Sequence, residues 1–314
     1  MRGFLLRRLG YALVTLLLVS VLVFVAAQVL PGDVGRTILG PFATPEQVDR
    51  LNAELGTDRP LPVRYADWLG SFLGGDWGES FRYHEPVRPL VSQRLVNSSA
   101  LASFAFLLAI PIAVLMGIVA ARRAGRLTDR VITVTGMSLI ALPEFVIGVV
   151  VLVVFAVNLR WFPTASMFPE ANPVDVVRQF LLPSLPLVFV LFGYVSQMAR
   201  AGTHEALESN YTRTAVLKGL PERTVLVRHV LRNGLLPTIT VIGVQMGWLI
   251  GGLTVVEVLF SYPGIGRLVI ESAVNHDLPV LQAAVLVMAA MYMFFNLSAD
   301  LLYGVLNPRI RRAT

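Results

Sequence analysis

The sequence predicts an all-α integral membrane protein with six transmembrane helices and with both termini in the cytoplasm. Three observations predict this fold: an apolar composition, six apolar stretches of spanning length, and the distribution of arginine among the loops. Of the 314 residues, 55% are hydrophobic and only 15% are charged, and the mean hydropathy is +0.68. Because an ordinary soluble domain is less apolar than this, we expect the chain to lie in a lipid bilayer.

A spanning helix needs about 20 apolar residues, because the hydrocarbon core is about 30 Å thick and a helix rises about 1.5 Å per residue. The first candidate follows Arg2, Arg7 and Arg8, as in a signal peptide, but it is longer than a signal core and has no cleavage pattern, so we expect it to be retained. Six stretches have the required length: Leu9–Leu30, Ser98–Ala121, Val131–Val157, Gln179–Ala199, Gly234–Val256 and Leu278–Leu302.

The orientation follows from the Lys and Arg residues, which gather in cytoplasmic loops. With a cytoplasmic N-terminus, the inside segments carry 16 of the 26 Lys and Arg residues, and the short outside loops carry only Arg160, Arg178 and Arg267. The long loop 31–97 holds the others, and its length weakens its influence on orientation. The net charge of +6 is therefore explained by inside-loop arginine, without a nucleic-acid partner. The absence of cysteine excludes disulfides and thiolate metal sites.

This pattern divides the chain into three parts. Residues 1–30 form the cytoplasmic N-terminus and the first span, residues 31–97 an external loop, and residues 98–314 a five-helix core that contains a cytoplasmic insert at 200–233. In the external loop, a capping-box pattern at Thr44 predicts one short amphipathic helix, and "PVRYADWLGSFLGG" predicts a second. These helices either cover the membrane surface and their own spans or form a docking platform for an outside partner.

The insert is the most polar long stretch in the second half of the chain. The spacing predicts a helix over about 202–218, a stop at Gly219, and a second helix that begins at Pro221 and runs into the fifth span. Such an ordered pattern favours contact with a protein partner at the inner membrane face. A DNA-binding helix pair fits less well, because the insert leaves no room for a separate three-helix core. One semi-apolar face of the first helix is expected to contain Leu207, Tyr211, Ala215 and Lys218.

The sequence contains no recognisable catalytic or metal-binding pattern. Its one lysine, Lys218, is preceded by Leu217 and followed by Gly219, which does not fit the G-x-x-x-x-G-K-[ST] loop of ATP-binding proteins. There is no G-x-S-x-G or H-E-x-x-H motif. We therefore expect no catalytic residue, no metal site and no bound cofactor in this chain. The histidines are scattered along the sequence at His84, His204, His229 and His276.

Six motifs resemble, in the same order, those of the first transmembrane permease of bacterial dipeptide, oligopeptide and nickel ABC importers. The resemblance covers nearly the whole chain. The motifs are "LPGD" at 30–33, "DRPLPVRYADWL" at 58–69, "GDWGES" at 75–80, "YTRTAVLKGL" at 211–220, "PGIGRL" at 263–268 and "DLLYGVLNPRIR" at 300–311.

The resemblance implies a type I importer permease in the bacterial cytoplasmic membrane, paired with a homologous second permease. Two ATP-binding subunits that hold ATP and Mg would lie inside, and an extracytoplasmic substrate-binding protein outside. In that family the insert is the coupling element that contacts an ATP-binding subunit. The resemblance assigns this contact to Glu205, Leu207, Tyr211, Arg213, Ala215, Lys218, Gly219 and Leu220.

The sequence departs from the family pattern at two places. "RLVNSS" at 94–99 lacks the expected proline and threonine, and Glu144, after Pro143, stands where a small or hydroxyl residue is usual. Because a charge inside a span is costly, we expect Glu144 to face the transport pathway or a protein partner. It would serve as a structural partner of the second permease, as a protonated silent acid, or as a site for the ammonium group of a substrate.

The fifth span contributes two further sets of candidates. Gln245 is a candidate pathway residue together with Pro143 and Glu144. The spacing of Gly243, Gly247 and Gly251 predicts a stripe for close helix packing, which we favour over a direct contact with substrate.

A proton-coupled secondary transporter is the main alternative function. Such proteins usually contain several ionisable residues in their spans and often show internal repeats. Here only Glu144 lies deep in a span, and the two halves of the chain show no repeat. The sequence leaves the substrate open among dipeptides, longer peptides, glutathione-like compounds and metal chelates.

Overall fold

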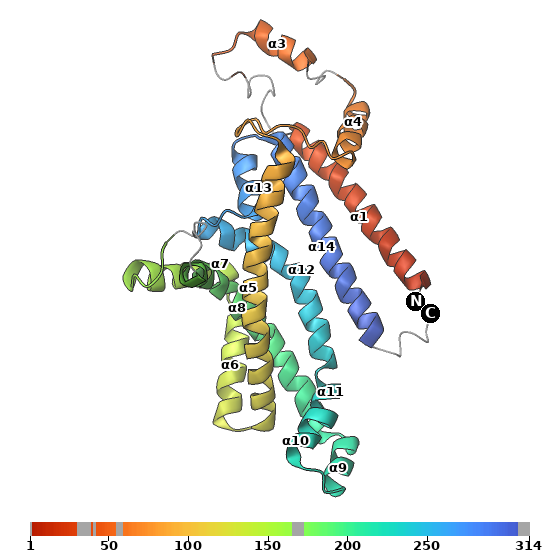
Figure 1. Ribbon diagram of the computed structural model, residues 1–314, viewed down its shortest axis with the longest axis vertical. Helices are drawn as coiled ribbons and strands as arrows, with labels where there is room; N and C mark the ends of the chain where they lie inside the picture. Colours follow the sequence, from red (N-terminus) through yellow and green to blue (C-terminus); the bar gives the residue numbers. More distant parts are fainter. Residues whose placement is uncertain (1, 30–38, 40–41, 55–58, 165–172, 307–314) are drawn as a thin grey trace. The chain divides into compact units, whose positions relative to one another are not determined.

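We describe the protein from a computed structural model, in which residues 2–29, 39, 42–54, 59–164 and 173–306 are defined (Figure 1). Within these ranges the secondary structure is helical apart from one isolated antiparallel bridge, so the predicted all-α fold is confirmed. The chain forms two compact units, which are described separately below. Unit 1 comprises Met1–Leu6, Ser99–Tyr262 and Tyr292–Thr314, and unit 2 comprises Arg7–Ser98 and Pro263–Met291.

Five of the described helices are long and apolar enough to cross a membrane, and a bent pair of helices brings the number to six if it counts as one span. Two of them, Val87–Arg122 and Pro173–Glu208, extend well beyond the stretches that hydropathy marks, because polar turns continue the same helices outside the apolar zone. The five helices are α1 (Arg2–Val29), α5 (Val87–Arg122), α8 (Pro173–Glu208), α12 (Leu236–Leu259) and α14 (Leu278–Leu306).

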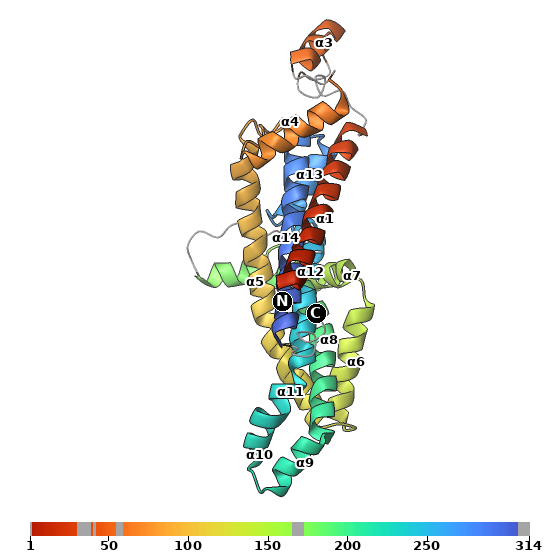
Figure 2. The ribbon, with the colours of Figure 1, turned by 90° about the vertical axis from the view of Figure 1, so that its right-hand side faces the viewer.

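The third span is bent, so the expectation of one continuous helix over Val131–Val157 is wrong. Helix α6 (Leu127–Ala141) ends before Pro143, and α7 (Glu144–Val151) continues as the π-helix η1 (Leu152–Asn158). The two parts meet at 105°, and Figure 2 shows the corner between α6 and α7. Proline has no N–H group and restricts the preceding residue to extended backbone, which Leu142 adopts with a ψ of 131°. Glu144 therefore begins a new helix.

In unit 1, α8 packs against α6, α7, α11 (Arg232–Gly234) and α12. Its buried leucines, Leu182, Leu187 and Leu191, belong to an apolar core shared with α5, α7 and α12. A helix that is apolar on several sides must be surrounded by other helices or by lipid. Helix α8 is thus the central helix of this unit.

Helices α8 and α11 approach each other closely where Gly202 crosses Gly234. A Cβ atom on Gly202 would lie 2.1 Å from the carbonyl oxygen of Gly234, and one on Gly234 would lie 2.7 Å from that of Gly202. Real Cβ contacts are not this short, so both positions require glycine. The two ends of the 200–233 insert are thereby held together at its base.

A buried ion pair fixes α6 to α8 near the same crossing. Asp129 in the first turn of α6 is buried, and Arg200 donates from Nε and Nη2 to its two carboxylate oxygens at 2.5 and 2.9 Å. The backbone N–H of Gly125 and the hydroxyl of Thr133 donate to the same carboxylate. Because a buried charge is tolerated only when its hydrogen-bonding capacity is satisfied, this arrangement sets the position of α6 against α8.

Unit 2 contains most of α1, the short helices α3 (Pro45–Glu54), α4 (Leu61–Leu73) and α13 (Ile265–Val274), and parts of α5 and α14. Both short amphipathic helices predicted in the external loop are confirmed. The N–H of Thr44 donates to Oε1 of Gln47, and the N–H of Gln47 donates to Oγ1 of Thr44, as expected for a capping box. Consecutive ring contacts join α1 to α4 and to the loop after it, through Phe24, Tyr65, Trp68, Phe72 and Trp77.

Replacing Gly202 by alanine is expected to destabilise the chain, because the new methyl group would overlap the backbone of Gly234. Overpacking of this kind costs on the order of 1–3 kcal/mol, and we expect the upper end of that range. The measurement is the thermal unfolding midpoint of the purified chain in detergent. Gly251→Ala is the matched control, because nothing lies within 4 Å of a Cβ at Gly251, and its midpoint should not fall. Equal midpoints for the two variants would contradict the glycine crossing.

Candidate functional site

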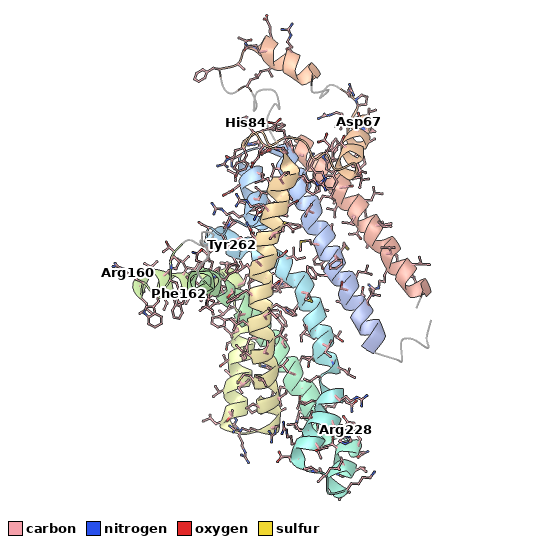
Figure 3. All side chains as sticks on the ribbon, viewed as in Figure 1. Asp67, His84, Arg160, Phe162, Arg228 and Tyr262 are labelled. Carbon is pink, nitrogen blue, oxygen red and sulfur yellow. The ribbon has the colours of Figure 1, made fainter. Side chains whose placement is uncertain are left out.

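The 200–233 insert lies at the end of unit 1 where α5 is joined to α6 (Figure 1). It consists of the end of α8, helix α9 (Asn210–Leu217), helix α10 (Glu222–Thr224) and the π-helix η2 (Val225–Leu231), which leads through α11 into α12. The second arm therefore runs into the fifth span as predicted. Arg228, labelled in Figure 3, lies on this arm.

The first arm is interrupted, and the expectation of one helix over 202–218 is wrong. Ser209 has an extended backbone, with a ψ of 152°, and its side chain accepts a hydrogen bond from the N–H of Thr212. The hydroxyl of Thr212 in turn donates to the carbonyl oxygen of Ala206 at 2.7 Å. A serine that caps the following turn competes with the continuing helix, so α8 ends and α9 starts in a new direction.

The elbow between the two arms lies at Gly219, as predicted. Its φ is +73°, in the left-handed region that favours glycine, and nothing lies within 4 Å of a Cβ placed there. The N–H of Gly219 donates to the carbonyl oxygen of Val216, and the N–H of Leu220 donates to that of Ala215. These bonds close the last turn of α9, and Pro221 is the N-cap of the next helix, which begins at Glu222.

The insert has a small hydrophobic core of its own, which connects its two arms. Ala206 and Ala215 from the first arm pack with Val225 and Val230 from the second. Ala215 is only 4% exposed, so it lies inside the hairpin and not on an outer face shared with Tyr211 and Lys218. A small side chain at position 215 thus allows the two arms to approach each other.

The outer surface of the insert carries large apolar side chains that the chain itself does not cover. Leu217 is 82% exposed, and Glu205, Arg213 and Lys218 are exposed as well. Exposed apolar groups that are close together indicate a contact with another molecule. The sequence interpretation missed Val216 and Leu217. If Ala215 is taken as the buried residue of the helix, these next two residues point away from the buried face. The exposed apolar residues of the insert are Tyr211, Val216, Leu217, Leu220 and Val227.

The insert is also linked to α5 by an ion pair. Arg122, the last residue of α5, donates to Glu222, the first residue of α10. Together with the Gly202–Gly234 crossing, this pair attaches both arms to the helices of the core. The ion pair is exposed to solvent and adds little by itself, so the Gly202–Gly234 crossing is the firmer of the two attachments.

Glu144, the first residue of α7, points at the fifth span. One carboxylate oxygen, Oε2, lies 2.8 Å from the position of a Cβ on Gly252, with Leu187 of α8 beside it. This oxygen is buried and has no hydrogen-bond partner among the residues that the structure describes. Gly252 makes room for the carboxylate, a feature that the sequence interpretation did not find.

Gln245 is buried in α12, and its Nε2 atom likewise has no partner in the described part of the chain. It precedes Gly252 by seven residues, or about 10 Å along the helix. Pro143 is the residue that caps α7. Pro143 and Glu144 are thus adjacent at the corner of the bent span, and Gln245 lies about two turns away along α12 from the point where Glu144 meets it.

The glycine stripe of α12 faces two different surroundings. A Cβ on Gly243 would lie 2.9 Å from Cβ of Ala299, and one on Gly247 would lie 3.4 Å from the ring of Tyr292, both on α14. No atom lies within 4 Å of a Cβ on Gly251. The first two glycines thus allow α14 to approach closely, whereas the third lies beside open space.

The titratable groups do not form a metal centre in the part of the chain that the structure describes, where no three His, Asp or Glu side chains gather closely enough to hold a metal ion. The buried carboxylate of Asp129 is already occupied by Arg200.

Comparison with known proteins gives matches along nearly the whole chain. Residues 1–102 match the family described as "Binding-prot-dependent transport system membrane comp, N-term", and residues 113–312 match "Binding-protein-dependent transport system inner membrane component". The chain is 35% identical over 312 residues to a peptide transport system permease protein of Brucella abortus (strain 2308), covering 99% of both chains. It is also 35% identical over 311 residues to the glutathione transport system permease protein of Salmonella typhimurium (strain LT2), again over 99% of both.

A peptide ABC transporter permease protein of Sinorhizobium fredii is 34% identical over 311 residues, which cover 98% of this chain and 99% of that one. These matches extend over both units and include the insert. The chain therefore belongs to the family of binding-protein-dependent transport system inner membrane components, and it is the non-catalytic permease component of an ABC transporter in the inner membrane.

Proposed function

We propose that this permease imports peptides or glutathione-like compounds, together with a homologous second permease, two ATP-binding subunits and an external binding protein. Two matches support the substrate class, since relatives at 35% identity over the full length are named for peptide and for glutathione transport. Zwitterionic compounds of this kind need a polar pathway through the bilayer, which one chain with mostly lipid-like helix surfaces does not provide. A second permease would complete it.

The insert is proposed as the element that contacts an ATP-binding subunit. The observation that carries this proposal is a rigid hairpin, with its own core of Ala206, Ala215, Val225 and Val230, that exposes Leu217 and its apolar neighbours. The hairpin is attached to α5 through Arg122 and Glu222. When the ATP-binding subunits close on ATP, such a body would transmit the rigid displacement to the spans.

ATP and Mg are proposed to bind only to the partner subunits. The only lysine of the chain, Lys218, lies at the elbow of the insert and outside any phosphate-binding loop pattern. The chemistry of ATP hydrolysis then occurs next to the insert, in another polypeptide.

Glu144 is proposed to interact with the positively charged end of a substrate. Its buried oxygen without a partner lies beside Gly252, at the corner of the bent span. Such an oxygen has the capacity to accept a hydrogen bond from an ammonium group that passes through the pathway. Two other roles are a bond to the second permease and a silent protonated acid. In either of these roles, a Glu144 variant should affect the uptake of cationic and neutral substrates equally.

The purified chain is expected to hydrolyse no ATP, because it lacks a phosphate-binding loop. The complete complex should hydrolyse ATP, and faster when the binding protein carries its substrate. Release of inorganic phosphate from each preparation is the measurement. Sustained ATP turnover by the isolated chain would contradict the assignment of ATP to the partners.

Leu217→Asp is expected to lower peptide uptake by the complex at least about tenfold, because a charge would be buried in the contact with the ATP-binding subunit. The unfolding midpoint of the chain itself should not change, since Leu217 is 82% exposed. Ala215→Asp should instead lower that midpoint, because its side chain is in the core of the hairpin. Phe42→Asp, at a 98% exposed position of the external loop, is the control and should leave uptake unchanged. Normal uptake by the Leu217 variant would contradict the proposal that the insert contacts the ATP-binding subunit.

Glu144→Gln keeps the size of the side chain and removes its charge. If the carboxylate attracts substrate, uptake of cationic peptides should fall about tenfold relative to that of neutral peptides, as expected for the loss of one charged hydrogen bond. Basal ATP hydrolysis and assembly should persist. Glu46→Gln, at an exposed position of α3, is the control. Equal uptake of both classes at wild-type rates would leave Glu144 without a role in the pathway.

A further inference from the structure

Two segments that are far apart in the sequence form one compact body in unit 2, which we call the outer cap. It consists of residues 77–98 and 263–284. The arginine distribution places the loops that it contains on the external side of the membrane. Its core contains Val87, Val91, Ile265, Leu268, Val280, Ala283 and Ala284.

A buried carboxylate joins the two segments of the cap. Asp277, in the turn before α14, is 1% exposed. It accepts hydrogen bonds from the hydroxyl of Ser80 at 2.5 Å and from the N–H groups of Phe81 and Arg82 at 3.2 and 3.3 Å. Three donors from one short loop thus converge on a side chain about 200 residues further along the sequence.

The loop held by Asp277 is itself closed into a tight turn, residues 79–86, which we call the finger. The N–H of Ser80 donates to the carbonyl oxygen of Glu85, and the N–H of His84 donates to that of Ser80. Glu79 and Pro86 form an antiparallel bridge. His84 has a φ of +52°, which non-glycine residues rarely adopt. The finger therefore has a defined shape that depends on the support beneath it.

Further polar contacts fix the cap on both sides of the finger. The side-chain N–H of Asn97 donates to the carbonyl oxygen of Pro263 at 2.7 Å, and the N–H of Ile265 donates to the hydroxyl of Ser98 at 2.8 Å. The hydroxyl of Tyr83 donates to Glu271 at 3.3 Å, and burial, together with this carboxylate, raises the pKa of Tyr83. These contacts and the three hydrogen bonds to Asp277 together fix the position of the finger on the cap.

The outer side of the finger is charged and accessible. Glu79, Arg82, His84 and Glu85 are exposed, and His84 is labelled in Figure 3. Such a surface is unsuited to the hydrocarbon of the bilayer. A rigid, charged, external surface suits a water-soluble protein partner, and a transport system of this family depends on a binding protein that must reach the permease from outside.

We propose that the finger is a docking surface for the external binding protein and that Asp277 is the residue that positions it. Because this rests on the proposed function, the test first establishes that the wild-type complex responds to its binding protein. The support of Asp277 pre-organises the finger, so its loss should weaken docking without slowing the steps that follow.

The experiment measures ATP hydrolysis by the reconstituted complex as the concentration of peptide-loaded binding protein is varied. Asp277→Asn is expected to raise the half-maximal concentration about tenfold, with the maximal rate and the basal rate unchanged. Glu79→Lys and Arg82→Glu reverse exposed charges, and the second also removes the contact of the Arg82 guanidinium with the ring of Tyr83. Both should shift the half-maximal concentration in the same direction without affecting assembly. Asp67→Asn is the matched control, because it makes the same chemical change in an exposed ion pair of α4 and should leave the curve unchanged.

The outcomes separate the two proposals. A wild-type complex that does not respond to the binding protein would contradict the proposed function. A wild-type response with unchanged half-maximal concentrations in both finger variants would overturn the docking surface, even if Asp277→Asn failed to assemble. Loss of the second permease from the purified finger variants would assign the finger to that contact instead, and would also overturn the proposal.

Discussion

The close approach of helices to α8 is the constraint on which the rest of unit 1 depends. Gly202 brings α8 into backbone contact with Gly234, and this crossing closes the base of the insert. From there Arg200 fixes α6 through Asp129. Since these contacts are short and specific, the insert and the helices around α8 are expected to move together, which is the mechanical property that a coupling element requires.

Four side chains with buried polar atoms represent two classes among the residues that the structure describes. Asp129 and Asp277 are fully supplied with donors, and each joins elements that are distant in the sequence. The Oε2 atom of Glu144 and the Nε2 atom of Gln245 are buried without partners among the described residues. The first class determines geometry, because an unsatisfied charge would destabilise the fold. The second class retains the capacity to form hydrogen bonds with a substrate or a partner subunit.

Family membership decides between the functions that the sequence left open. A proton-coupled secondary transporter requires no partner at the inner face, whereas the matches here are to components of binding-protein-dependent systems along both units. In this setting the single acid in the third span does not have to act as a proton relay. Its buried oxygen, which lies beside Gly252 and has no partner among the described residues, is available for a contact with another molecule.

The features that the sequence predicts correctly are those that depend on short-range interactions along the chain. The apolar stretches determine the spans, because any chain in hydrocarbon must satisfy its backbone within helices. The capping box at Thr44 and the stop at Gly219 were also predictable, since a cap or a left-handed residue acts within one turn. The bend has a local signal in the sequence, which is Pro143 itself. Hydropathy alone does not reveal the bend, because both halves of the span are apolar.

Only the tertiary structure shows which side chains are covered and which distant residues are in contact. Ala215 and Leu217 are two residues apart, and the sequence does not say which of them is covered until the second arm of the insert packs against the first. Asp277 and Ser80 meet across nearly 200 residues, and no local pattern marks them as partners. The sequence by itself determined the family, the all-helical class and most of the spanning helices, because these depend on composition and short-range spacing. The position of each buried charge was decided by the folded chain, because a carboxylate is stable in the interior only where distant donors converge on it.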